Sequence, residues 1–355
     1  MREYVHDLKL MTAENEWFDK PPRTLSLDDV PELRNEVHKN PRTAFENVGL
    51  LNNRFSRSQD ARLVSGAIDQ ERANFYLWSL EKQHLRASMT QTNASCYDVC
   101  DEALAVGCTD GAVKIWSFSS LESRNLDTTS LVNASPTTSI SHRSSLGMVP
   151  FIRTRAKDKV VNVRIDHNDG TFLHLATSTE KGEANVWDVT KGEIIVSIPS
   201  RAVVNADTKG RVLWSAGNEG TVRWWGGKSA KILSKSALCE GSISALEMDE
   251  TVVVGGYSEQ GMEAWDVRTQ QSLCTFSNRE HGGIKSLQFD NRKLVSVSST
   301  GKAAMWRWYE PNPVRWFEPP TPSARFISTK FNDRHLVFGT DNGQLVDYDR
   351  LATVL

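Results

Sequence analysis

The side chains best suited to chemistry, eight histidines and five cysteines, are scattered along the 355 residues of this chain. The histidines form no pair at metal-ligand spacing, and the cysteine group at 96, 100 and 108 has no nearby partner pair that would complete a zinc site. No HExxH, GxSxG or GxGxxG motif occurs. The phosphate-loop candidate Gly227-Lys228-Ser229 has Val222 where a glycine is required. We therefore expect a protein that is not an enzyme and that needs no metal or cofactor.

A short pattern recurs along the chain, in which an aromatic residue follows a turn glycine after five residues. It occurs as "CTDGAVKIW", "EKGEANVW", "NEGTVRWW", "STGKAAMW" and "DNGQLVDY", with "EQGMEAW" and "DQERANFYLW" as looser copies. The intervals between successive aromatic residues are 38, 71, 38, 40, 41 and 42, close to the period of units with four strands each. The long interval contains the Ser/Thr-rich tract 118–146, which we predict to be a disordered insertion. The seven aromatic residues are Trp78, Trp116, Trp187, Trp225, Trp265, Trp306 and Tyr348.

Each copy of the pattern is the end of a longer unit. Two β-type runs precede the glycine, as in "IKSLQFD" and "KLVSVSS", and a further run such as "EIIVSIP" or "SLCTFS" follows the aromatic residue. Short connections rich in Asp, Asn and Gly can join only antiparallel neighbours, so each unit is predicted to be a four-stranded meander. The repeat aromatic should end the third strand and pack against the next unit. The expected turn residues after the first strand are Asp166, Asp249, Asp290 and Asn332.

Seven such units, two of them with Trp-Asp at residues 187–188 and 265–266, resemble the WD-repeat β-propeller family over residues 50–355. The resemblance implies an all-β, seven-bladed β-propeller at 42–355. His281 stands where the family has a histidine, but the family's set of His, Ser/Thr, Asp and Trp is complete in no unit. Thr109, Asp110 and Trp116 come closest to it.

The segment 1–41 is expected to be an extension with a short helix, which Ser26 would cap and which has apolar residues at helical spacing. An open ring leaves raw sheet edges, so both chain ends should contribute to one sheet. We expect residues 42–52 to pair with the last unit.

Acidic residues recur in the turns between the second and third strands of the units. In a ring of meanders these turns open on one face, where the carboxylates would form an acidic rim suited to a basic peptide. The alternative is that they are simply solvated turns, and the basic run "RTRAKDK" at 153–159, which we place in a loop on the same face, weakens the rim. The residues are Asp69, Asp110, Glu180, Glu219, Glu259 and Asp341.

Two other features are candidates for partner binding. Trp316 and Phe317, beside the Pro-rich "EPPTPS", are expected to offer an exposed aromatic contact. The stretch "AWDVR" resembles the Trp-Asp-x-Arg box of substrate receptors for cullin-4 ubiquitin ligases. By that resemblance Trp265 packs, Asp266 orients and Arg268 contacts the ligase adaptor. In ordinary WD repeats the same arginine is a solvated loop charge.

Composition narrows the choice of function. Charged residues make up 24% of the chain and the net charge is -2, so no global basic field favours nucleic acid or a membrane surface. The first residues resemble neither a secretory signal nor a membrane span, which predicts an intracellular protein, cytoplasmic or nuclear. The leading interpretation is a non-catalytic scaffold that binds other proteins or peptides. The alternatives are a cullin-4 ligase receptor and an enzyme with a pocket in the central channel.

Overall fold

The structure is a computed structural model of the whole chain. It describes residues 22–26, 47–51, 62–69, 72–100, 103–117, 148–153, 158–168, 172–188, 193–199, 203–206, 212–216, 222–226, 229–232, 239–249 and 251–349. These ranges contain 28 strands. No helix in them has the length and apolar character needed to cross a membrane.

Six sheets each consist of four consecutive antiparallel strands. The first three are β2–β5, β6–β9 and β10–β13, with the bounds β2 Asn47–Leu51, β3 Arg62–Asp69, β4 Arg72–Ser79, β5 His84–Thr92, β6 Ala94–Val99, β7 Ala103–Cys108, β8 Ala112–Ser117, β9 Met148–Arg153, β10 Val160–Asn168, β11 Phe172–Thr179, β12 Glu183–Asp188 and β13 Glu193–Pro199. The next three are β14–β17, β18–β21 and β22–β25, with the bounds β14 Val203–Ala206, β15 Val212–Ala216, β16 Val222–Gly226, β17 Ser229–Ile232, β18 Ile243–Met248, β19 Val252–Tyr257, β20 Met262–Asp266, β21 Ser272–Phe276, β22 Ile284–Phe289, β23 Lys293–Ser298, β24 Ala303–Arg307 and β25 Arg315–Phe317.

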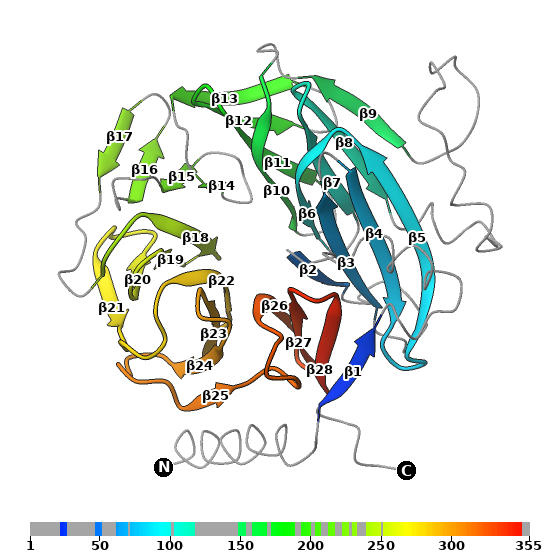
Figure 1. The fold of residues 1–355 in the computed structure, drawn as a ribbon. Coiled ribbons are helices and arrows are strands. Elements are labelled where there is room, and N and C mark those ends of the chain that lie inside the picture. Colours follow the sequence, from blue (N-terminus) through cyan, green and yellow to red (C-terminus); the bar gives the residue numbers. More distant parts are fainter. Residues whose placement is uncertain are drawn as a thin grey trace, which may run out of the picture.

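A seventh sheet joins the two ends of the described chain. It contains β26 Phe326–Phe331, β27 His335–Thr340 and β28 Gln344–Asp349, and its fourth strand is β1 Arg23–Ser26. Figure 1 shows the sheets arranged around a centre, with the first strand of each sheet innermost and the fourth, or β1, outermost. The predicted all-β, propeller-like architecture is confirmed.

The closing strand is not the one that the sequence predicts. Strand β1 pairs antiparallel with β28, from Arg23 opposite Asp347 to Ser26 opposite Gln344. Part of the expected 42–52 segment forms β2 instead, and β2 pairs with β3 as the innermost strand of its own sheet. The stretch 1–41 therefore contributes a strand to the ring. The predicted helix after Ser26 and the predicted insertion at 118–146 lie outside the described residues.

All seven repeat aromatics lie in third strands, as predicted, from Trp78 in β4 to Tyr348 in β28. Where the side chain is described, the repeat aromatic packs against the preceding sheet, which corrects the expectation. Trp187 joins Val113 and Ile115 of the sheet before it, and Trp306 joins residues of β18–β21. Side chains alternate along a strand, so Val113 and Ile115 face the following sheet while Trp116, their neighbour, faces back toward β2–β5.

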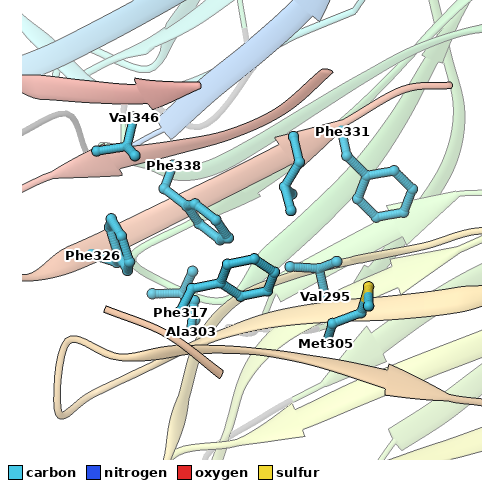
Figure 2. Close-up of a cluster of buried hydrophobic side chains, with 10 residues drawn as sticks. Val295, Ala303, Met305, Phe317, Phe326, Phe331, Phe338 and Val346 are labelled. Atoms are coloured by element: carbon cyan, nitrogen blue, oxygen red, sulfur yellow. The ribbon is translucent and has the colours of Figure 1, made fainter. Parts of the chain in front are cut away.

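The apolar core is therefore a series of layers between neighbouring sheets. Figure 2 shows one of them, where Phe317 and Met305 of β22–β25 meet Phe326 and Phe338 of the closing sheet. The rings of Phe326 and Phe338 stack with their centroids 4.6 Å apart, and the ring centroids of Phe317 and Phe338 are 5.2 Å apart. Each such layer buries apolar area from two sheets, and this burial is the dominant favourable contribution to folding.

The turn between the first and second strands is closed by the predicted Asp or Asn side chain at three of the four predicted places. Asp249 accepts backbone hydrogen bonds from Thr251 and Val252, and Asp290 and Asn332 make equivalent bonds. Asp166 is the exception, because it lies inside β10, opposite His174.

Candidate functional site

The innermost strands surround a central channel that carries charged side chains at one level. Asp98, Arg164, Glu247 and Lys330 come from β6, β10, β18 and β26. In the second strand of each sheet, one residue pairs with the repeat aromatic, and the residue after it pairs with the charged residue of the first strand. This shared register places the four charged side chains at equal depth in the channel. Gln288 of β22 shares this level and bonds the backbone of Phe331 in the next sheet.

Ion pairs cross the channel at this level. Arg164 Nη1 lies 3.0 Å from Glu247 Oε1 and 3.8 Å from Asp98 Oδ1, and Arg164 Nη2 donates to the carbonyl oxygen of Leu246 at 3.3 Å. Lys330 Nζ lies 3.6 Å from Glu247 Oε1. We name these four residues, Asp98, Arg164, Glu247 and Lys330, the channel charge layer. It therefore links four of the sheets through their innermost strands.

The electrostatics of the layer favour the charged forms of Glu247 and Arg164. Burial alone would raise the pKa of Glu247, but the nearby charges of Arg164 and Lys330 outweigh it and hold that pKa below its ordinary value. Burial likewise opposes the charge on Arg164, yet the carboxylates of Glu247 and Asp98 raise its pKa. Glu247 is therefore unprotonated near neutral pH and is engaged by both cations.

A cavity of about 220 Å³ lies in the channel. Besides the channel charge layer, its lining includes Ser95, Cys96, Asn162, Ser244, Lys285 and Ser286. Burial raises the pKa of the Cys96 thiol to about 12, so the sulfur is not a thiolate. None of the lining residues is a histidine. Elsewhere in the described ranges, too, no three His, Cys, Asp or Glu side chains gather closely enough to hold a metal.

The hydrogen-bonded set implied by the family resemblance is most nearly complete in β22–β25. The hydroxyl of Ser296 accepts the indole N–H of Trp306 at 2.8 Å and lies 2.7 Å from Nε2 of His281. Burial lowers the pKa of His281 to about 4, so the ring is neutral. The sequence predicted the unit of Thr109, Asp110 and Trp116 instead. That prediction is wrong, because the second-strand residue in the hydroxyl position there is Val106.

Two sheets use the same indole-to-hydroxyl bond. Trp78 Nε1 donates to Ser65 Oγ at 2.9 Å and Trp187 Nε1 donates to Thr177 Oγ1 at 3.0 Å. The hydroxyl residue stands two positions beyond the residue paired with the tryptophan. Sequence reasoning missed this position, although a Ser or Thr ten residues before the tryptophan at 187 and at 306 is a signal that could have revealed it.

The acidic turns lie on one face of the ring by strand order, but their carboxylates are partly used within the turns. Asp110 Oδ1 accepts from the backbone N–H of Ala112, and Asp341 Oδ1 accepts from that of Arg325. Glu180 and Glu259 are exposed. The side chain of Asp69 and the whole of Glu219 lie outside the described part. We name the face that carries these turns the acidic-turn face.

Basic residues also lie on the acidic-turn face. Of the predicted basic run, Lys159 is exposed, while residues 154–157 and the side chain of Arg153 lie outside the described part. Lys181, in the turn between β11 and β12, forms an ion pair with Asp158 in the connection before β10. The backbone N–H of Glu180 donates to the carbonyl oxygen of Lys159 in the same connection. This pairing of charges favours solvated, locally paired turns over a uniform acidic rim.

The Trp-Asp-x-Arg stretch spans the end of β20 and the following turn, on the opposite face. Trp265 is buried, 1% exposed, and packs with Val222 and Val253. Asp266 accepts the backbone N–H of Thr269 at 2.6 Å, and this bond lowers the pKa of its carboxyl. Arg268 is exposed within that turn, and its charge lies near Asp266. The structure thus brings all three residues together and directs the arginine to solvent.

The aromatic pair at 316–317 does not form an exposed contact. Phe317 is 3% exposed and belongs to the core layer of Figure 2. Trp316 is partly buried, with its ring 5.4 Å from that of His281. In strand β25 the two side chains point to opposite sides of the sheet, and each meets a neighbouring packing layer. Tyr309, 72% exposed in the preceding loop, is the aromatic residue that faces solvent there.

Comparison with known proteins supports the fold alone. No protein-family model matches the sequence, and no curated protein matches it. Among solved structures, the crystal structure of the computationally designed Ika8 protein is similar, with a TM-score of 0.57 and 15% identity. The match covers 87% of this chain and 96% of that one. The fold is a β-propeller arrangement of antiparallel sheets.

Proposed function

We propose that this chain is a non-catalytic scaffold that binds other proteins. The observation that carries the proposal is the use of its acids and buried histidines to hold the fold. Glu247 and Asp98 are paired with Arg164, His281 lies against Ser296, and His335 Nδ1 lies 3.0 Å from Asp347 Oδ1. Groups engaged in this way are not free to act as general bases or nucleophiles.

The propeller fold is compatible with this role, because it presents loops on two faces of a rigid ring, although fold alone does not determine function. Affinity purification of the full-length protein, followed by mass spectrometry, tests the proposal. We expect partner proteins to be recovered in amounts comparable to the bait. Failure to recover any partner, together with turnover of a small molecule by the purified protein, would point to the enzyme class instead.

The conformation of the 266–269 turn favours a more specific role, that of substrate receptor for a cullin-4 ubiquitin ligase. Asp266 closes the turn through its bond to Thr269, so Arg268 is held in place at low entropic cost before any partner arrives. In the receptors that this stretch resembles, the equivalent arginine contacts the ligase adaptor. The role therefore depends on Arg268 as the contact residue, in a turn that Asp266 closes.

Substitution of this arginine separates the receptor from a general scaffold. Arg268→Ala should leave stability unchanged within about 0.5 kcal/mol, as is typical of exposed positions. It should weaken adaptor binding by roughly 2–5 kcal/mol, the usual cost of removing a buried interface charge. Arg279→Ala is the matched control, since Arg279 is also exposed but lies between β21 and β22 on the acidic-turn face. Co-purification of the adaptor that is equal for both variants, or absent for the wild type, excludes the receptor.

A further inference from the structure

The channel cavity contains one cation, Lys285, that no carboxylate among the described residues neutralises. Its lining carries three cations, Arg164, Lys285 and Lys330, and two carboxylates, Asp98 and Glu247. The channel charge layer pairs Arg164 and Lys330 with the two acids. Lys285 remains, exposed in the channel, and the described residues give it no carboxylate within ion-pair distance.

The position of Lys285 explains why its ammonium group is free. It lies in a β-bulge at the start of β22, between Ile284 and Ser286. Ser95 and Ser244 occupy the same bulge position in their own sheets. Their hydroxyls donate to the carbonyl oxygens of Val160 and Ile284, each the first residue of the innermost strand in a neighbouring sheet. Lys285 occupies the same bulge position as these two serines, and its long cationic side chain lines the cavity.

Two neutral groups beside the cavity have unused hydrogen-bonding capacity. Ser286 Oγ accepts the backbone N–H of Thr329 at 3.3 Å, so its own hydrogen can still be donated. Asn162 has a side-chain oxygen that is buried without a partner among the described residues. A half-turn of this amide would present its NH₂ group to the cavity instead. Lys285, Ser286 and Asn162 could together supply one charged and two neutral donors.

From this arrangement we propose that the cavity binds a small free oxyanion, a phosphate or a carboxylate, with Lys285 as its main ligand. The volume of about 220 Å³ lies below the roughly 300–1,000 Å³ of sites that take drug-sized molecules. It suits a single anionic group of a few atoms. The ionised Glu247 also lines the cavity, but Arg164 and Lys330 compensate its charge. The site is independent of the proposed scaffold role.

Calorimetric titration of the full-length protein with inorganic phosphate and, separately, with malonate tests the site, at an ionic strength held constant with sodium chloride. We expect saturable binding of at least one of the two anions. Lys285→Gln should weaken that binding roughly tenfold or more, as expected for loss of a charge-assisted hydrogen bond. Lys285→Arg, which keeps the charge, should retain most of it.

Lys302→Gln is the matched control, because Lys302 is a 52% exposed lysine outside the cavity lining, paired with Glu318. Asn162→Asp provides a second, nearly isosteric variant that places a carboxylate at the cavity and should abolish binding. Circular dichroism of each variant confirms that it is folded. No binding of either anion to the wild type, or equal binding by wild type and Lys285→Gln, overturns the proposal.

Discussion

At the scale of single residues, Trp265 lacks the indole-to-hydroxyl bond that Trp78, Trp187 and Trp306 make. Trp265 Nε1 is buried without a partner among the described residues, because Gly255 stands at the position of Ser65, Thr177 and Ser296. A Cβ atom at Gly255 would lie 3.1 Å from the edge of the Trp265 ring, so a side chain fits there only after a small shift.

Substitution of this glycine can separate steric cost from hydrogen bonding. Gly255→Ala and Gly255→Ser force the same shift of the indole ring, but only serine offers an acceptor to its N–H. We expect the serine variant to be more stable than the alanine variant by about 1 kcal/mol, the usual net value of one hydrogen bond. Urea denaturation of both variants measures the difference. Equal stability would show that the hydroxyl does not reach Nε1.

A second prediction at the scale of single residues concerns how stability changes at acidic pH. Because burial holds the pKa of His281 at about 4, against an ordinary value of 6.5, the folded state binds the proton less readily than the unfolded state. The stabilisation is complete above pH 6.5 and is lost as the pH falls toward 4. At roughly 1.4 kcal/mol per pKa unit, the total is about 3 kcal/mol. Unfolding free energies across this range should fall less steeply for His281→Gln than for the wild type, and parallel curves would contradict the assignment.

At the scale of elements, the third strands were predictable and the closing strand was not. A glycine and an aromatic residue at fixed spacing mark a local hairpin, and that information lies within ten residues of sequence. Strand β1 has only four residues, and its partner β28 lies more than 300 positions away. Nothing in "RTLS" distinguishes it from a loop until the open edge of β28 is known. The direction in which the aromatics pack also depends on the order of the ring rather than on any one hairpin.

In the candidate site, too, features that lie within one short stretch of sequence could be predicted, and features that join distant strands could not. The Trp265, Asp266 and Arg268 stretch is contiguous, so its turn could be placed from sequence. The channel charge layer joins residues such as Asp98 and Glu247 from separate sheets, and only the shared register of the innermost strands brings them together. Phe317 was misassigned because an aromatic residue beside prolines has the same sequence signature whether it is buried or exposed.

Strand β1 should contribute to stability through one side chain in particular. Leu25 is 5% exposed and packs with Trp78 and Val337, while Thr24 on the other side of the strand is exposed. Leu25→Ala should lower the free energy of unfolding by roughly 2–5 kcal/mol, as for other buried leucines. Thr24→Ala is the matched control on the same strand, with little expected change. If chemical denaturation finds the two variants alike, β1 does not hold the ring closed.

At the scale of the whole molecule, closure is reinforced where the two chain ends meet. Asp349 of β28 lies 3.4 Å from Arg23 of β1 and accepts two bonds from Arg334. Arg334 also bonds Glu81, which lies in the turn between β4 and β5 of the neighbouring sheet. The bonds to Asp349 and Glu81 raise the pKa of Arg334 above its ordinary value. Asp349 thus ties the closing strand to the rest of its sheet, and Arg334 extends this network to the next sheet.

The Arg164–Glu247 pair of the channel charge layer couples two sheets, β10–β13 and β18–β21, that are not neighbours in the ring, and a double-mutant cycle can measure this coupling. Arg164→Met leaves Asp98 and Glu247 without their shared cation in an enclosed channel, and breaking such a pair typically costs about 3–5 kcal/mol. The side chains of Arg164 and Glu247 are about one-fifth exposed, so we expect the lower part of that range. Once Glu247→Gln has removed one of the carboxylates, adding Arg164→Met should cost less, and the difference is the coupling energy.

The exposed pair of Lys302 and Glu318, 3.4 Å apart, is the reference for this cycle. Its coupling should not exceed about 1 kcal/mol, because solvent screens exposed ion pairs. The channel pair should also respond to acid. Since the pKa of Glu247 is lowered in the folded state, its contribution is present above the ordinary carboxyl pKa and is lost as the pH falls through the folded value. Glu247→Gln should therefore flatten the acid limb of the stability curve. A channel coupling no larger than that of the surface pair would mean that the sheets are held by their apolar layers alone.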